Sequence, residues 1–205
     1  TLHALDFLES DGRRFWLGPR VLLVAHAYLA SRPTPQLAQP LLDALSERTR
    51  QSASLGKLQD DDVIIIARST ARRSLSTGLG IGSRLPAYCS SLGRVVLANL
   101  PEAARRIGDM RRGPLTPKTI YELAAVLEKV DRCRRDGWTG ADGELELGVR
   151  SIAVPVCGQD GKFIAGLSIS VGAERMSMTE FTRTLLPVLM QARDTLQRSL
   201  FGACS

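Results

Sequence analysis

The chain has 205 residues, 44% of them hydrophobic and 23% charged, a balance typical of a soluble globular protein with an apolar core. That length predicts one sizeable domain, or one domain with an appendage. No apolar run reaches the roughly 18 to 20 residues that a bilayer span requires, and the N-terminus lacks a basic-then-apolar signal pattern. We therefore expect a cytoplasmic protein.

The formal net charge of +6 favours an acidic partner such as nucleic acid. The arginines, however, occur as scattered pairs along the chain and not as one cluster. Such pairs more often lie on solvated helix faces and loops. Charge by itself therefore does not assign a nucleic-acid site.

The four cysteines (Cys89, Cys133, Cys157 and Cys204) include no C-x-x-C pair, and the chain has only two histidines. This spacing excludes the usual zinc and iron–sulfur patterns, so no metal or other cofactor is expected. Cys89 directly precedes a helix start, where a thiolate can be stabilised. A small buried thiol is the alternative interpretation of the same residue.

The N-terminal segment predicts a β-hairpin. Asp11-Gly12 separates two runs with apolar residues, which is a strong short-turn signal, and Arg13 and Arg14 follow it. The first five residues are typical of the end of a helix. A helix end followed by a basic hairpin is how a winged helix-turn-helix finishes, so Arg13 and Arg14 are candidate DNA contacts. A plain edge hairpin is the alternative.

Two helices are expected next. Pro19 at a first helical position opens a helix through about residue 31, and Arg32-Pro33-Thr34-Pro35 breaks it. A second amphipathic helix spans about 36–51. This arrangement predicts a boundary between a linker and the following domain near residues 31–35.

Strands dominate the middle and the later part of the chain. The β-branched run at 63–67 is apolar on both faces, as in a central strand. Residues 75–81 are expected to be extended, with glycines that do not match a dinucleotide-binding loop. Segments 149–156 and 162–171 form a hairpin about a turn at 158–161. Strand alternation places Ser168 and Ser170 on one face.

Helices alternate with these strands. Ser90 or Ser91 caps a helix through Ala98, and Pro101-Glu102 and Thr116-Pro117 mark two further helix starts. A long helix spans about 118–136 and ends at Gly137. The last helix, about 179–200, contains Pro187 and is expected to kink there. The pattern predicts an α+β fold with a mostly antiparallel sheet.

A small-molecule site is the functional prediction from these elements. A helix N-terminus attracts carboxylates, so the turn at Ser91, Leu92 and Gly93 is a candidate anion site, with Gly93 leaving room for a ligand. Hydroxyls from Ser151, Ser168 and Ser170 would add polar contacts, and Leu85, Leu92 and Val149 would form the apolar wall. The alternatives are a simple helix cap, solvent-facing strand serines and, for Asp142, a turn residue.

Four segments together resemble the isocitrate-lyase-regulator-type (IclR) transcription factors. They are the run from Leu85 to Ala98, the pair Gly137-Trp138, the run from Glu144 to Val156, and Gly166 to Ser170. The resemblance covers nearly the whole chain, in the same order and spacing. It implies three parts: residues 1–18 as the end of a winged helix-turn-helix, 19–34 as a linker helix and 35–205 as an effector-binding domain.

This resemblance implies a GAF-like effector domain, in which helices flank a curved antiparallel sheet. The effector would lie against Ser91-Leu92-Gly93, and the regulator would be a homodimer or tetramer that binds DNA through its winged helix. Many relatives carry an acidic or amide residue where this chain has Ala141, so Asp142 is either a replacement for that contact or a turn residue. Relatives also often have Cys in place of Ser151.

The segments Leu-Pro-Ala-Tyr-Cys (85–89) and Glu-Leu-Gly-Val-Arg-Ser (146–151) are most similar to the branch that regulates aromatic-acid degradation through protocatechuate and β-ketoadipate. That similarity implies an effector such as 4-hydroxybenzoate or protocatechuate. The competing hypothesis is a GAF-like enzyme or redox domain that uses Cys89, which requires a nearby base or second thiol. Direct DNA binding by this chain would depend on the hairpin alone.

Overall fold

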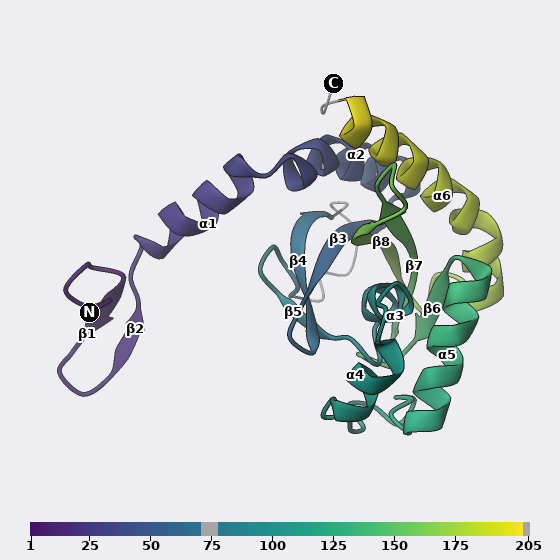
Figure 1. Cartoon of the computed structure of the whole chain (residues 1–205), viewed down its shortest axis with the longest axis horizontal. Coiled ribbons are helices and arrows are strands. Elements are labelled where there is room, and N and C mark those ends of the chain that lie inside the picture. Colours follow the sequence, from purple (N-terminus) through teal and green to yellow (C-terminus); the bar gives the residue numbers. More distant parts are fainter. Residues whose placement is uncertain (71–77, 203–205) are drawn as a thin grey trace.

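The computed structural model describes residues 1–70 and 78–202. A six-stranded antiparallel sheet with the strand order β5-β4-β3-β8-β7-β6 forms its centre (Figure 1). The strands are β3 (Ser52–Gln59), β4 (Asp62–Ser69), β5 (Arg84–Pro86), β6 (Thr139–Asp142), β7 (Val149–Cys157) and β8 (Phe163–Gly172). Five helices flank this sheet, so the predicted α+β class with an antiparallel sheet is confirmed.

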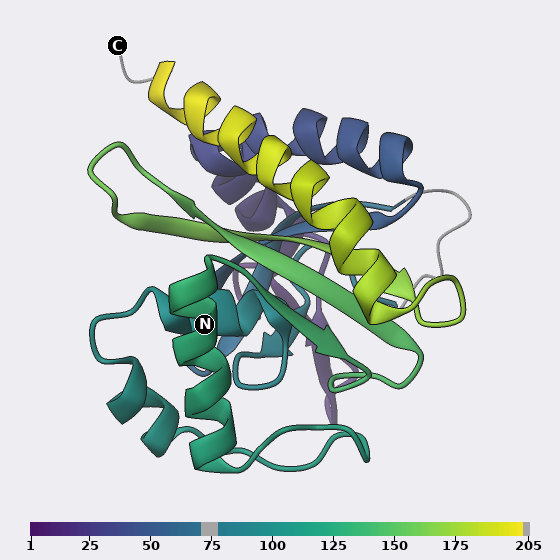
Figure 2. The same ribbon diagram turned by 90° about the vertical axis from the view of Figure 1, so that its right-hand side faces the viewer.

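The helices cover both faces of the sheet (Figure 2). Helices α2 (Pro33–Thr49) and α6 (Met178–Gly202) pack on one face. Helices α3 (Ser91–Ala98), α4 (Ala103–Asp109) and α5 (Leu123–Asp136) lie on the other face. Each face therefore has its own apolar core.

Side-chain alternation divides the strands between these two cores. In β4, Val63 and Ile65 belong to the core under α3, whereas Ile66 belongs to the core under α2 and α6, as expected for a central strand. In β8, Leu167 and Ile169 face α2 and α6. The serines between and after them therefore face α3, where a site can form.

The N-terminal part projects from this body (Figure 1). Strands β1 (Leu8–Ser10) and β2 (Phe15–Leu17) pair as the predicted hairpin, and α1 (Val21–Ser31) joins it to α2. None of the residues of α1 is buried within the chain. The structure thus confirms the hairpin and the two successive helices, with α2 beginning at Pro33 and not at residue 36. Proline is favoured in the first turn of a helix, which leaves Arg32 as the break.

Three strands were missed by the sequence patterns. β3 has the sequence SASLGKLQ and lacks a β-branched run, yet it lies in the middle of the sheet because its small residues face a pocket and a closely packed helix. β5 and β6 are short edge strands of three and four residues. Local propensity is weak in such strands, because cross-strand pairing determines them.

Two other expectations are wrong in part. The helix expected from 118 begins at Leu123, because Thr119 Oγ1 accepts from the N–H groups of Leu115 and Thr116 and so holds this segment in a non-helical turn. Gly137 ends that helix as predicted, with a positive φ of 72°. For the extended segment 75–81, residues 75–77 lie outside the described residues, and Ile81-Gly82 form a turn into β5.

Pro187 lies inside α6, which the structure assigns as one helix across that residue. Among the described residues, no helix is both long and apolar enough to cross a membrane.

Replacing Phe181, which is fully buried between α6 and the sheet, tests the core under α2 and α6. We expect Phe181→Ala to lower the free energy of unfolding by about 3–5 kcal/mol, because the lost ring leaves a cavity. Urea denaturation measures this change. The control Leu147→Ala removes a side chain that is 57% exposed and should change stability by no more than about 0.5 kcal/mol. Equal losses in both variants would contradict the assigned core.

Candidate functional site

A pocket lies between the N-terminus of α3 and the sheet face opposite α2 and α6. It contains seven of the nine ligand-binding residues predicted from the sequence: Leu85, Ser91, Leu92, Val149, Ser151, Ser168 and Ser170. The remaining residues that line it are Ser54, Ile65, Arg68, Leu79, Ser90, Ala141, Glu144, Leu145 and Glu146. The pocket encloses about 60 Å³.

The two serines at the start of α3 have different roles. Ser90 is the N-cap: its Oγ accepts from Gly93 N at 3.1 Å and donates to Pro86 O at 2.8 Å. Ser91 Oγ instead donates to Ser151 Oγ at 2.8 Å, across the pocket from helix to sheet. The capping interpretation therefore holds for Ser90, whereas Ser91 is available to a ligand at the positive end of the helix.

Gly93 does not line the pocket. A Cβ atom at this position would lie 2.2 Å from Ala87 Cα and 2.3 Å from Ala87 O. The glycine therefore allows α3 to pack closely against the preceding segment, and it does not make room for a ligand as the sequence had suggested. Its effect on the pocket is indirect, through the position of the helix.

Asp142 also lies outside the pocket. Its carboxylate accepts from Arg150 Nε at 3.0 Å and lies 3.9 Å from Lys118 Nζ. Adjacent residues of a strand point to opposite faces, so Ala141, which pairs with Ser151, faces the pocket and Asp142 does not. In this structure Asp142 therefore does not place a polar group in the pocket at the position of Ala141.

Arg68 is a pocket residue that the sequence patterns missed. Its Nη1 donates to Ser54 Oγ at 2.6 Å, and its Nε is buried with no hydrogen-bond partner among the described residues. Burial lowers the pKa of the guanidinium from its ordinary value. The available signal was a charged residue directly after the apolar run 63–67, which is unusual in a central strand.

A β-bulge directs Arg68 into the pocket. The register of β3 and β4 shifts between Leu55 and Gly56, so that Ile66 is an extra residue on β4. Plain alternation from Ile65 would have put residue 68 on the α2 and α6 face. The bulge reverses that alternation, and Arg68 now pairs with Ser54 on the pocket side.

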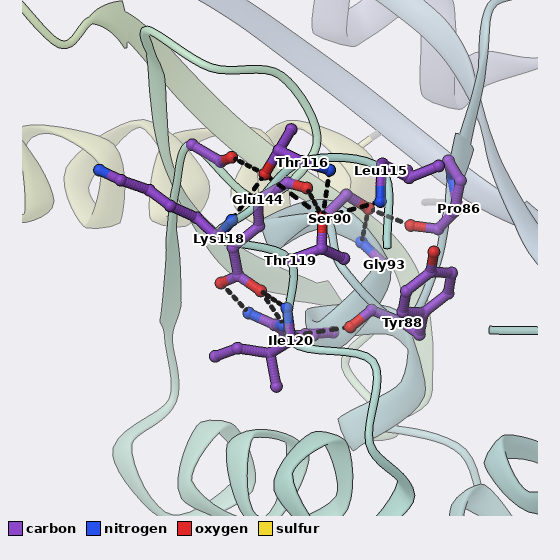
Figure 3. Close-up of polar contacts among 12 residues, drawn as sticks. Pro86, Tyr88, Ser90, Gly93, Leu115, Thr116, Lys118, Thr119, Ile120 and Glu144 are labelled. Atoms are coloured by element: carbon purple, nitrogen blue, oxygen red, sulfur yellow. Dashed lines mark hydrogen bonds and ion pairs between the residues drawn. The ribbon is translucent and has the colours of Figure 1, made fainter. Parts of the chain in front are cut away.

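A buried ion pair fixes one wall of the pocket (Figure 3). Arg94, fully buried in α3, donates from Nη1 and Nη2 to the two carboxylate oxygens of Glu144 at 2.7 and 2.5 Å. Arg94 Nε donates to Tyr88 O, and Glu144 Oε2 also accepts from Ile120 N at 3.2 Å. The backbone oxygen of Glu144 accepts from Thr119 Oγ1. These bonds hold the loop before β7 against α3.

Cys89 is a buried thiol, and burial raises its pKa to about 11. At neutral pH the group is therefore protonated, which is the opposite of the activation that a nucleophile needs. The same burial raises the pKa of Cys133 to about 12. The structure thus contradicts the hypothesis of an acidified Cys89 at the helix start.

Arg13 and Arg14, the predicted DNA contacts, lie at the exposed turn of the hairpin. Their N–H groups donate to Asp11 Oδ1 at 2.9 and 2.7 Å, which shapes the turn. In the part of the chain that the structure describes, no group of His, Cys, Asp and Glu side chains could hold a metal ion.

The fold agrees with comparisons to known proteins. Residues 26–197 match the family model described as bacterial transcriptional regulator IclR, C-terminal. The chain belongs to the IclR family. The Pca regulon regulatory protein of Pseudomonas putida is 38% identical over 98% of this chain and 70% of the relative's length. The p-hydroxybenzoate hydroxylase transcriptional activator of Acinetobacter baylyi is 33% identical over 96% of this chain and 75% of that relative.

Solved structures of IclR-family proteins show the same fold. A transcriptional regulator from Rhodococcus sp. RHA1 superposes with a TM-score of 0.88 at 35% identity, covering 98% of this chain and 82% of the other. The inducer-binding domain of an Acinetobacter PobR double mutant, solved with 3-hydroxybenzoic acid, has a TM-score of 0.74 at 31% identity. It covers 80% of this chain and 97% of that domain.

Removing one partner of the buried pair should destabilise the fold strongly, because the other charge remains buried. We expect Arg94→Met to lower the free energy of unfolding by about 3–5 kcal/mol, and Arg94→Met with Glu144→Leu to recover part of the loss. Chemical denaturation measures both. The matched control is Arg105→Met, which breaks an exposed pair with Glu102 and should cost at most about 1 kcal/mol. A similar cost for Arg94→Met and the control would argue against this role.

Proposed function

We propose that this chain is the ligand-sensing part of an IclR-family regulator that binds a small aromatic carboxylate and controls genes of aromatic-acid catabolism. The observation that carries the proposal is the hydroxyl-lined pocket at the start of α3, formed by residues from β3, β7 and β8. The family membership and the PobR inducer-binding domain with 3-hydroxybenzoic acid support it.

The composition of the pocket suits an aromatic acid. Leu85, Leu92 and Val149 offer an apolar wall for a ring. Ser151 and Ser168 add hydroxyls that can donate to a ligand oxygen or accept from a ligand hydroxyl. An apolar pocket with a few convergent polar groups is the usual form of a small-molecule site.

The small volume of the pocket implies that its walls must move when an aromatic ligand binds. The pocket encloses about 60 Å³, whereas a cavity that accepts benzene measures about 150 Å³. An aromatic acid therefore enters only when the walls move apart, and the ligand selects that expanded state. Glu146 lines the pocket from the exposed segment 146–148, which follows Glu144, the residue that Arg94 holds.

A sensing role without catalysis is part of the proposal. The relatives are transcriptional regulators, and the protonated thiol of Cys89 does not supply a nucleophile. DNA binding would use the winged helix of a full-length protein, to which the hairpin with Arg13 and Arg14 would contribute. Such a regulator acts where the bacterial chromosome lies, in the cytoplasm.

Thermal unfolding tests the ligand. We expect 4-hydroxybenzoate or protocatechuate, added well above its dissociation constant, to raise the Tm, because a ligand that binds only the native state stabilises it by about 2.7 kcal/mol at 100 times Kd. Differential scanning fluorimetry with hydroxybenzoates, β-ketoadipate and short 2-oxo acids measures the shift. A Tm unchanged by the hydroxybenzoates and protocatechuate would overturn the aromatic proposal, while the fold assignment would stand.

We also propose that the regulator is a homodimer or tetramer in which α1 is a contact surface. Leu22, Leu23 and Val24 on this helix are 70, 63 and 58% exposed, and Tyr28 is 42% exposed. Large apolar side chains that are exposed together on one helix are usually covered by a partner. A second copy of the chain could supply a matching helix through a two-fold contact.

Charge on α1 should disrupt that contact. We expect Leu22→Glu with Leu23→Glu to reduce the molar mass in solution relative to the wild type, as measured by light scattering or sedimentation. The control Leu147→Glu places the same charge at an exposed leucine in the loop before β7 and should leave the assembly intact. A wild-type chain that is monomeric at all concentrations, or a variant that assembles like the wild type, would contradict the proposed surface.

A further inference from the structure

Arg68 is a half-buried cation that has no carboxylate partner among the described residues. The only hydrogen bond from its guanidinium to another side chain among the described residues is the one from Nη1 to Ser54 Oγ at 2.6 Å. It forms no ion pair within residues 1–70 and 78–202. The segments 71–77 and 203–205 contain no Asp or Glu in the sequence.

The environment of Arg68 differs from that of Arg94, whose partner Glu144 also lines the pocket. Arg94, a fully buried residue of α3, has both oxygens of Glu144 as acceptors. A guanidinium taken out of water without such a partner is destabilising, since its desolvation is not offset. Arg68 Nε is buried and has no hydrogen-bond partner among residues 1–70 and 78–202, which leaves this donor for the carboxylate of a ligand in the pocket.

The sheet places Arg68 at one end of a polar row. Ser54 on β3 pairs with Arg68 on β4 and with Ser168 on β8, so these three residues lie side by side on the pocket face. Ser151 on β7 pairs with Ser170 on β8, one strand further along. Three strand spacings separate β4 from β7, roughly 14 Å at the backbone. The arginine side chain and a benzoate ring can together span that distance.

The charges of the pocket orient the ligand. Glu144 and Glu146 line the pocket from the loop that leads into β7, at the end far from β4. Glu144 is already bonded to Arg94, and Glu146 forms no ion pair with Arg68 among the described residues. Because Arg94 offsets the charge of Glu144, Glu146 is the group at this end that would repel a carboxylate, whereas it would not repel an uncharged hydroxyl. The anionic end of the ligand therefore belongs at Arg68.

We propose that Arg68 binds the carboxylate of the effector, while the hydroxyl end of the ligand lies toward Ser91 and Ser151. This inference rests on the proposed function and deepens it, because it makes Arg68 the residue that selects acids over neutral aromatics. Ser54 Oγ accepts a hydrogen bond from Arg68 Nη1 and so fixes the position of the guanidinium. The bidentate geometry of a guanidinium and a carboxylate suits this contact.

The test compares an acid with its neutral isostere. Isothermal titration calorimetry would measure 4-hydroxybenzoate and 4-hydroxybenzamide binding to the wild type, to Arg68→Gln and to Arg105→Gln. We expect Arg68→Gln to weaken binding of the acid by about 10- to 100-fold, the range for charge-assisted hydrogen bonds, and to change binding of the amide by less than about threefold. Arg105→Gln removes the same charge from an exposed site on α4 and should change neither.

A crossed variant tests the orientation. Ser151→Ala should reduce the preference for 4-hydroxybenzoate over benzoate, which lacks the hydroxyl, and should leave the preference for acid over amide intact. Arg68→Gln should do the reverse. The Tm of each variant without ligand checks folding, and Arg68→Gln should match or exceed the wild type because it removes a half-buried cation that has no carboxylate partner among the described residues.

The outcomes separate this inference from the proposed function. Equal loss of acid and amide binding in Arg68→Gln, or no loss of either, overturns the role of Arg68 while the aromatic effector stands. If the wild type binds a short 2-oxo acid such as pyruvate but no aromatic acid, the aromatic proposal fails, and the same comparison with pyruvamide decides the role of Arg68. Failure of the wild type to bind any carboxylate in the panel overturns both.

Discussion

The ion pair of Arg94 and Glu144 is the interaction on which the pocket depends. It joins the middle of α3 to the loop before β7, and Glu144 also accepts from the segment that precedes α5. It ties α3 to this loop, which hydrogen bonds from Thr116 and Thr119 already join to the segment before α5. Because both charges are buried, their mutual geometry must be good for the fold to tolerate them. The same bonds fix the distance between the helix N-terminus and the sheet.

Around this anchor, the pocket is formed by the alternation of strand residues. Leu167, Ile169 and Ile152 fill the core under α2 and α6, so Ser168, Ser170 and Ser151 point the other way. One face of the central strands is therefore mostly apolar and the other carries hydroxyls. A helix over the second face converts that polar surface into an enclosed site. The close approach of α3, which Gly93 permits, keeps the site small.

The sequence predicted much of this arrangement, and the errors have physical causes. Caps, glycine stops and period-two alternation located the hairpin of β7 and β8, the start of α3 and the end of α5. The strand β3 was missed because it has small residues, which line the pocket or allow close packing, and these residues have a low strand propensity. The start of α5 was misplaced because Thr119 uses its hydroxyl to hold a turn. Asp142 was considered a ligand contact, but the neighbouring Arg150 binds it on the other face.

By itself the sequence determined the fold class, the hairpin of β7 and β8, most of the helices and seven residues of the pocket, because these follow from local periodicity, capping and resemblance to a family. Only the tertiary structure decided which charged residues lie in the pocket or beside it. Arg94 and Glu144 are 50 residues apart, and nothing local indicates that they meet. Arg68 reaches the pocket through a one-residue bulge at Ile66, since an extra residue reverses which face each later side chain occupies. A shift of that kind depends on pairing with another strand, which the order of residues does not reveal.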